Sequence, residues 1–76
     1  MKKLLEYIIR SIVQNPNDVL VKEQMENDYL NLIIKVHPED IKIVIGKNGQ
    51  TIKALRELVK IKALKEGKRA NVKIEE

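Results

Sequence analysis

Two glycines bracket two polar residues in the segment Gly46-Lys47-Asn48-Gly49. Glycine has no Cβ, so the backbone there can come close to a ligand. Lys47 adds a mobile positive charge, while Asn48 tolerates left-handed geometry and can hydrogen-bond sugar or phosphate oxygens. A helix that begins near Gln50 would point its free N–H groups and positive dipole end at the same place, which attracts phosphate. These residue types at this spacing predict a loop that binds a phosphate backbone. The same spacing is also typical of a plain tight turn between two helices.

The charge distribution adds weight to a polyanionic partner. The net charge of the 76 residues is +4. Residues 1–37 carry five basic and five acidic side chains, whereas residues 41–73 carry ten basic and two acidic ones, a difference of +8. A neutral half joined to a basic half suits binding to a nucleic acid. A lysine-rich surface that only keeps the protein in solution would have the same composition.

The elements that must position this loop follow from hydrophobic periodicity. Apolar residues recur at spacings of three and four from Leu4 to Val13, which predicts a helix that stops near Asn15, before Pro16. Alternating apolar residues predict a β-hairpin with strands at 19–26 and 29–36. Helices are expected at 39–45 and 50–66, and a last strand at 69–75. The order α-β-β-α-α-β predicts an α+β fold, with a three-stranded sheet packed on three helices.

With this order of elements, two stretches resemble the KH domain family of the second topological type, and its small single-domain bacterial members in particular. They are Val44-Ile45-Gly46-Lys47-Asn48-Gly49 and Ile52-Lys53-Ala54-Leu55-Arg56. The resemblance covers essentially the whole chain, so it implies one type II KH domain over residues 1–76. It further implies that the loop Gly46-Lys47-Asn48-Gly49 grips the backbone of about four nucleotides of single-stranded RNA.

The resemblance also implies which residues surround the loop. Val44, Ile45, Ile52 and one face of the strand at 29–36 would line an aliphatic groove for the bases. Lys53 and Arg56 would flank the RNA. A purely structural role in the core is the alternative for Ile45 and Ile52, and ordinary solvated helix charges are the alternative for Lys53 and Arg56.

A contact between two KH proteins is a further expectation. The resemblance implies a homodimer, or a heterodimer with a larger KH-containing protein, acting as a post-transcriptional regulator or RNA chaperone. On the helix at 50–66, the 100° period places Ile52, Leu55, Leu58, Val59 and Ala63 on the core face. Ala54, Ile61 and Leu64 lie away from that face and are the predicted dimer interface. The alternative is that the hairpin or the first helix covers them.

Several function classes are disfavoured. There is no cysteine and only one histidine, His37, so neither a metal site nor an enzyme is expected, and no cofactor is implied. No apolar run is long enough to span a bilayer, no membrane partner is expected, and no signal-peptide cleavage site follows the N-terminal stretch, so a cytoplasmic location is predicted. Two alternatives stay open: a helix-turn-helix DNA-binding protein with helices at 39–45 and 50–66, and a KH-like protein-interaction module without RNA binding.

Overall fold

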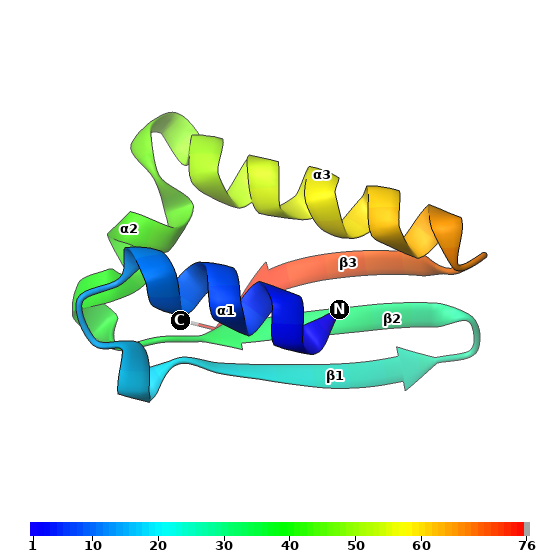
Figure 1. Cartoon of the computed structure of the whole chain (residues 1–76), viewed down its shortest axis with the longest axis horizontal. Coiled ribbons are helices and arrows are strands. Elements are labelled where there is room, and N and C mark those ends of the chain that lie inside the picture. The colour runs from blue at the N-terminus through cyan, green and yellow to red at the C-terminus, as the bar shows by residue number, and fades with distance from the viewer. Residues whose placement is uncertain (76) are drawn as a thin grey trace.

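A computed structural model describes residues 1–75 of the chain (Figure 1). The order of elements is the expected α-β-β-α-α-β, which confirms the α+β class and the type II KH fold. Single 3₁₀ turns at Pro16–Asp18, Pro38–Asp40 and Lys47–Gly49 join some of them. The helices and strands are α1 (Lys2–Ile12), β1 (Leu20–Glu26), β2 (Tyr29–Lys35), α2 (Ile41–Ile45), α3 (Gln50–Lys65) and β3 (Arg69–Ile74).

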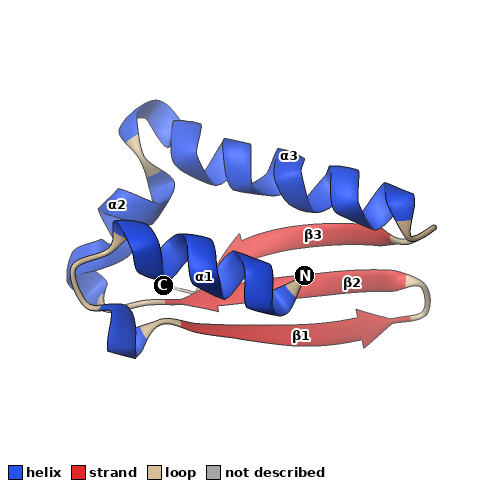
Figure 2. Cartoon of the chain, viewed as in Figure 1, coloured by secondary structure: helices blue, strands red, loops and turns tan. Residues whose placement is uncertain are grey.

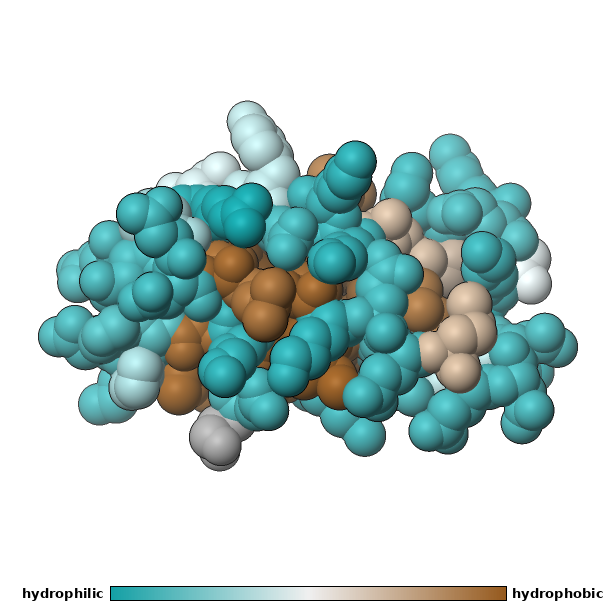
Figure 3. Space-filling model, turned by 90° about the horizontal axis from the view of Figure 1, so that it is seen from below, coloured by the Kyte–Doolittle hydropathy of each residue, from teal (hydrophilic) through white to brown (hydrophobic). Residues whose placement is uncertain are grey.

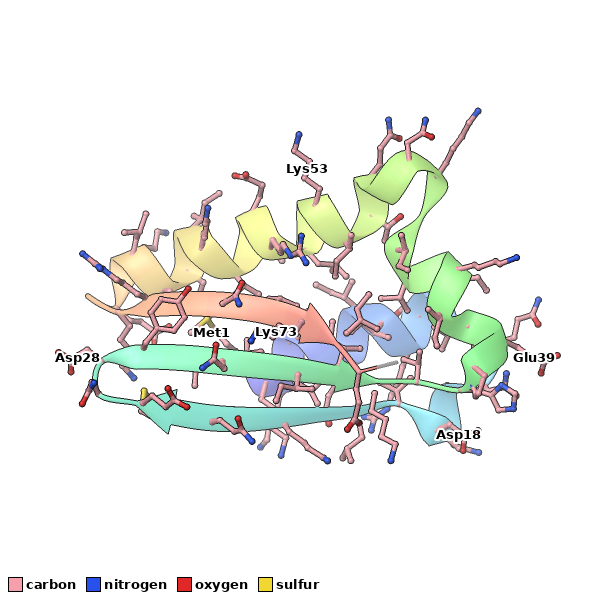
Figure 4. All side chains as sticks on the ribbon, turned by 180° about the vertical axis from the view of Figure 1, so that it is seen from behind. Met1, Asp18, Asp28, Glu39, Lys53 and Lys73 are labelled. Atoms are coloured by element: carbon pink, nitrogen blue, oxygen red, sulfur yellow. The ribbon has the colours of Figure 1, made fainter. Side chains whose placement is uncertain are left out.

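The three strands form one mixed sheet in the order β1-β2-β3. β1 runs antiparallel to β2, and the tight turn between them holds Asn27 in left-handed geometry, with φ of 57°. β3 runs parallel to β2, which requires a long crossover, and α2 and α3 provide it. The helices lie on one side of the sheet, as the views from the front and from behind show (Figures 2 and 4). Because β3 is last in the strand order, it is an edge strand, and it packs beside α3.

The core between the helices and the sheet is aliphatic throughout the described chain. Strand β2 buries alternate residues, Leu30, Leu32 and Ile34, against the helices. Helix α1 contributes Leu5 and Ile9, both almost completely buried. Burial of aliphatic side chains stabilises the fold by about 25 cal/mol per Å² of apolar surface removed from water. Figure 3 shows the molecule from the edge of the sheet formed by β1. On this surface, hydrophobic residues gather in the middle, between hydrophilic side chains.

Strand β1 is less buried than its alternation predicts. Val21 is the only buried residue of β1, and Met25, expected on the same face, is 54% exposed. The reason is visible in Figure 1, where the end of β1 extends beyond α1, so that no helix covers it.

The first helix also ends earlier than predicted, at Ile12, because Val13 is already extended with φ of −92° and ψ of 164°.

A buried carboxylate, Asp40, fixes the start of α2 to the chain that follows α1. It accepts hydrogen bonds from the backbone N–H of Gln14 at 3.1 Å, the backbone N–H of Asn15 at 2.9 Å and the Asn15 side-chain amide at 3.1 Å. Burial by itself raises the pKa of Asp40, but these hydrogen bonds and the nearby His37 outweigh it and lower the pKa below its usual value. Asp40 therefore stays charged at neutral pH and anchors the helix that leads into the loop at 46–49.

Candidate functional site

The loop between α2 and α3 has a shape that only glycine permits at its first position. Gly46 has φ of 79° and ψ of 172°. A Cβ at this position would lie 2.6 Å from the Cβ and 2.8 Å from the backbone nitrogen of Thr51, and closer still to its hydroxyl oxygen. Such approaches require other atoms to shift. The glycine thus lets the incoming chain pack directly on the first turn of α3.

The rest of the loop is a single tight turn with an exposed tip. Asn48 and Gly49 both have left-handed geometry, with φ of 56° and 73°. The backbone N–H of Gly49 donates to the carbonyl of Gly46 at 3.1 Å, which closes the turn. The side chains of Lys47 and Asn48 are exposed at the tip. A positive charge and a hydrogen-bonding amide are therefore held in a fixed loop.

The loop leads directly into the longest helix. α3 begins at Gln50, directly after Gly49, and its first turn holds no acidic residue. The free N–H groups and the positive dipole end of a helix attract anions, and no carboxylate in the first turn competes for them. Lys47 lies just before this helix end. Together they form a place where a phosphate group is electrostatically favoured.

The hydrophobic residues expected to line a groove lie mostly in the core. Val44 has no exposed surface and Ile52 is only 7% exposed, so both pack inside the protein. This corrects the expectation that Val44 lines a groove, and it leaves Ile52 little surface for a ligand. The physical reason is that α2 and α3 face each other here and share these side chains. Ile45, at the end of α2, is half-buried and is the one of the three with substantial surface for a ligand.

A cleft of about 210 Å³ runs between α3 and the edge strand β3. It is lined by Lys53, Arg56, Glu57 and Lys60 of α3 and by Ala70, Asn71 and Val72 of β3. Lys53 projects away from the strands, so it stands at the rim (Figure 4). The Nε of Arg56 donates to the carbonyl of Val72 at 3.2 Å and thereby reaches across the cleft. Arg56 is therefore held against the edge of the sheet, and Lys53 lies at the outer rim of the same cleft.

The strand that borders this cleft is β3, whereas the sequence reasoning expected the hairpin's second strand. β2 is the middle strand of the sheet, and the face of β2 that carries Leu30, Leu32 and Ile34 is buried in the core, so the residues that border the cleft come from β3. Ala70, Asn71 and Val72 were missed for this reason. The signal that bears on them is the short turn Glu66-Gly67-Lys68, which leads the chain from α3 directly into the next strand, so that the start of β3 lies beside the end of α3.

Two of the three residues predicted to form a dimer interface, Ala54 and Ile61, do not line this cleft, whereas the third, Leu64, borders its continuation between α3 and β3. Ala54 is exposed, Ile61 is 58% exposed and Leu64 is 73% exposed, so neither the hairpin nor α1 covers them. Leu58 was predicted on the core face; this was wrong, because Leu58 is 43% exposed and belongs with these residues instead. It borders a shallow hollow together with Leu4 of α1. We call Ala54, Leu58, Ile61 and Leu64 the apolar edge; its role in dimerisation stays a prediction.

Other kinds of site find no support in residues 1–75. That part of the chain has no group of three or more His, Cys, Asp or Glu side chains arranged to hold a metal ion. It also has no helix long and apolar enough to cross a bilayer. His37 stands at the entry to the turn before α2, where its Nδ1 accepts a hydrogen bond from the backbone N–H of Glu39 at 3.0 Å. A structural role therefore accounts for the single histidine.

Comparison with known proteins identifies the family. The family model described as "KhpA/KhpB, KH domain" matches residues 2–74. The chain belongs to this KH-domain family. It is 46% identical over 74 residues to the RNA-binding protein KhpA of Clostridium perfringens, covering 97% of this chain and 99% of that protein. It is 42% identical to the KhpA of Halalkalibacterium halodurans, covering 97% of each.

A third relative, the RNA-binding protein KhpA of Thermotoga maritima, is 48% identical over 59 residues, which are 78% of this chain and 79% of that protein. The family is one of binding proteins and not of enzymes, which confirms the expectation that the chain has no catalytic role. Membership also decides between fold families: the helices α2 and α3 belong to a KH domain and not to a helix-turn-helix unit. In keeping with this, α2 has only five residues.

Proposed function

We propose that this protein binds single-stranded RNA through the loop Gly46-Lys47-Asn48-Gly49 and the cleft between α3 and β3. The observation that carries the proposal is the loop's fixed, exposed shape at the N-terminal end of α3, with Lys47 at its tip. Relatives that match over nearly the whole chain bear the name RNA-binding protein, which supports RNA as the partner.

The geometry suggests how the work is divided. Phosphate and sugar oxygens would lie at the loop, where backbone N–H groups, the dipole of α3 and Lys47 are all favourable. The bases would then lie in the adjacent cleft, with Lys53 at its rim. KH domains bind unpaired nucleotides, whose bases are free to enter a cleft of about 210 Å³. Single strands are therefore the preferred ligand.

The direct test reverses the charge of the loop. Lys47→Asp together with Asn48→Asp should leave the fold intact, because both side chains are exposed, yet RNA binding should collapse as two carboxylates now face the phosphates. A matched control is Lys3→Asp with Asn17→Asp. This pair changes the net charge by the same amount, at exposed positions that are distant from the loop in the sequence. Binding is measured with short labelled RNA and DNA oligomers. A folded loop variant with unchanged affinity would overturn the proposal.

We further propose that the apolar edge of α3 joins this protein to a second KH protein, either a copy of itself or a larger KH-containing partner. Three large aliphatic side chains lie exposed along one helix face, and the neighbouring Leu4 of α1 is also 41% exposed. An apolar strip of this kind is stabilised when a second surface covers it. A two-fold contact between two α3 helices would do so, since each copy offers the same strip.

Action as a post-transcriptional regulator or RNA chaperone in the cytoplasm fits a small RNA-binding protein and stays part of the proposal. The same holds for the description of residues 1–76 as a single KH domain.

A further inference from the structure

A second hollow continues the cleft along α3 toward the end of that helix. It has a volume of about 250 Å³ and is lined by Tyr29, Lys60, Leu64, Lys68, Arg69 and Ala70. Lys60 and Ala70 border both this hollow and the cleft nearer the loop. The two hollows are therefore parts of one channel between α3 and β3. Between Lys53 and Leu64 the helix rises about 17 Å.

The chemistry of this second hollow differs from that of the first. Its wall holds Leu64, Ala70 and the ring of Tyr29, which is 41% exposed. Its rim holds the exposed cations Lys60, Lys68 and Arg69, and among residues 1–75 no carboxylate lines it. An exposed aromatic ring surrounded by positive charges suits a base that stacks and a phosphate that is neutralised.

The channel has a defined end. Beyond Tyr29 and Arg69 lies a third hollow, whose other lining residues include Glu26 and Asp28 of the hairpin turn. Two carboxylates repel phosphate, so a nucleic acid that follows the channel would be stopped there. The change from cations to carboxylates falls at Tyr29, which lies beside Arg69 because the two residues are register partners between β2 and β3.

We infer that Tyr29, Lys68 and Arg69 form a second RNA subsite, which holds a base and phosphate beyond the roughly four nucleotides that a KH loop grips. The inference rests on the proposed function, because the same strand must first bind at the loop. The occupant is RNA and not a protein, because the hollow is continuous with the RNA cleft and its charges complement phosphate. Tyr29 stacks on the base, and Lys68 and Arg69 neutralise the phosphate.

The test compares short and long RNA. Affinities are measured for labelled oligoadenylates and oligouridylates of about four and about eight nucleotides. Tyr29→Ala should weaken binding of the longer RNA roughly fivefold or more and leave the shorter RNA unaffected. Tyr29→Phe should bind like the wild type, since stacking needs only the ring. The matched control is Tyr7→Ala, which removes the chain's other tyrosine from an exposed position on α1.

A second variant covers the case in which Tyr29→Ala does not fold. Lys68 is exposed in the turn after α3, so Lys68→Glu should fold and should weaken only the longer RNA, several-fold. Leu64 belongs both to the apolar edge and to the wall of this hollow, so the affinities are compared at protein concentrations at which sedimentation gives the same mass for the wild type and each variant.

The outcomes separate this inference from the proposed function. Equal binding of short and long RNA by the wild type, lost in both cases when the loop is charge-reversed, would overturn the second subsite and leave the loop site standing. So would folded Tyr29 and Lys68 variants that bind the longer RNA like the wild type. Failure of the wild type to bind any RNA would overturn both.

Discussion

The two ends of α3 are built alike and packed differently. Near each end the chain bends at a glycine with positive φ, with φ of 79° at Gly46 before the helix and 69° at Gly67 after it. At the first end, Gly46 is pressed against Thr51, so that no Cβ fits. At the second end, apart from Gly67 and its two chain neighbours, no atom of the described chain lies within 4 Å of a Cβ added to Gly67. There the backbone N–H of Lys68 donates to the carbonyl of Ala63 at 2.8 Å, as in an ordinary glycine cap.

This difference shows that a glycine with positive φ serves two purposes in this fold. The first end is a loop of fixed shape whose polar tip faces outward, which is what a backbone-binding loop requires. The second end only stops a helix, and the large side chains near it, Ile61 and Leu64, lie exposed. RNA binding is accordingly expected to depend on the shape of the first end, and partner binding on the surface near the second.

The largest effect should come from adding one methyl group at the first end. Gly46→Ala places a Cβ against the backbone of Thr51 and also forces alanine into a region reserved for glycine, so the free energy of unfolding should fall by about 3 kcal/mol or more. Gly67→Ala adds the same group in open space and should cost only about 1 kcal/mol, the strain of left-handed geometry. Denaturant unfolding of both variants checks this. Equal losses would break the comparison between the two ends.

The buried carboxylate below the first end should give the next largest effect. Asp40→Ala leaves the N–H groups of Gln14 and Asn15 without their acceptor, and the melting temperature should fall on the order of 10 °C. The acid dependence has a definite sign. Because the folded-state pKa of Asp40 is lowered, the unfolded chain binds the proton more readily, so this stabilisation is present at neutral pH and is lost as the pH falls below about 4.

Asp40→Asn separates the charge from the shape. It keeps one acceptor oxygen but cannot titrate, so its melting temperature should lie below that of the wild type at pH 7, with the gap narrowing on acidification. Thermal melts of both proteins between about pH 7 and pH 3 check this. Parallel curves would show that Asp40 titrates alike in the folded and unfolded chains.

Much of this arrangement could be predicted from the sequence because it depends on local patterns. The 3.6-residue period marks α1 and α3, the alternation marks β2, and Gly46 to Gly49 mark the bend, so the type and order of the elements follow from neighbouring residues. Exposure of Ile61 and Leu64 also follows from the helical period alone. The position of Met25 did not, because its burial depends on how far α1 extends over β1.

The candidate site was harder to predict because it joins distant segments. Alternation shows which residues of a strand share a face, but not which strand lies beside α3. The strand that borders the cleft beside α3 could therefore not be identified from the sequence, and the hydrogen bond from Arg56 to Val72 could not be foreseen. Val44 carried the same ambiguity: in a short helix, an aliphatic residue beside a glycine loop fits a groove as well as a core, and only the packing of α2 on α3 places it inside.

A smaller structural effect, with a clear readout, is expected at the apolar edge near the second end. Ile61→Asp should yield a folded monomer that still binds RNA. Its affinity should be lower than that of the wild type only if the RNA sites of the two subunits of a dimer act together. The residue is 58% exposed, so its loss costs the monomer little, whereas a carboxylate in an apolar contact is strongly unfavourable. Sedimentation at high micromolar concentration measures the mass. Tyr7→Asp is the control, since it places the same charge on an exposed side chain of α1. A wild-type protein that is monomeric under these conditions would contradict the prediction.

The smallest effect, and the finest comparison of the two ends, lies in the salt dependence of RNA binding. Each phosphate neutralised on a single strand contributes about −0.7 to the slope of log affinity against log salt. Three or four contacts from residues such as Lys47, Lys53 and Arg56 therefore predict a slope of roughly −2 to −3 for the wild type.

Lys47→Ala should reduce the slope by about 0.7 with RNA of any length, because the loop is always engaged. Lys68→Ala at the second end should reduce it by a similar amount only with the longer RNA. Lys3→Ala on α1 should change neither slope. A wild-type slope near zero would point to a partner other than a nucleic acid, and equal effects of Lys47 and Lys68 on the shortest RNA would mean that the strand does not begin at the loop.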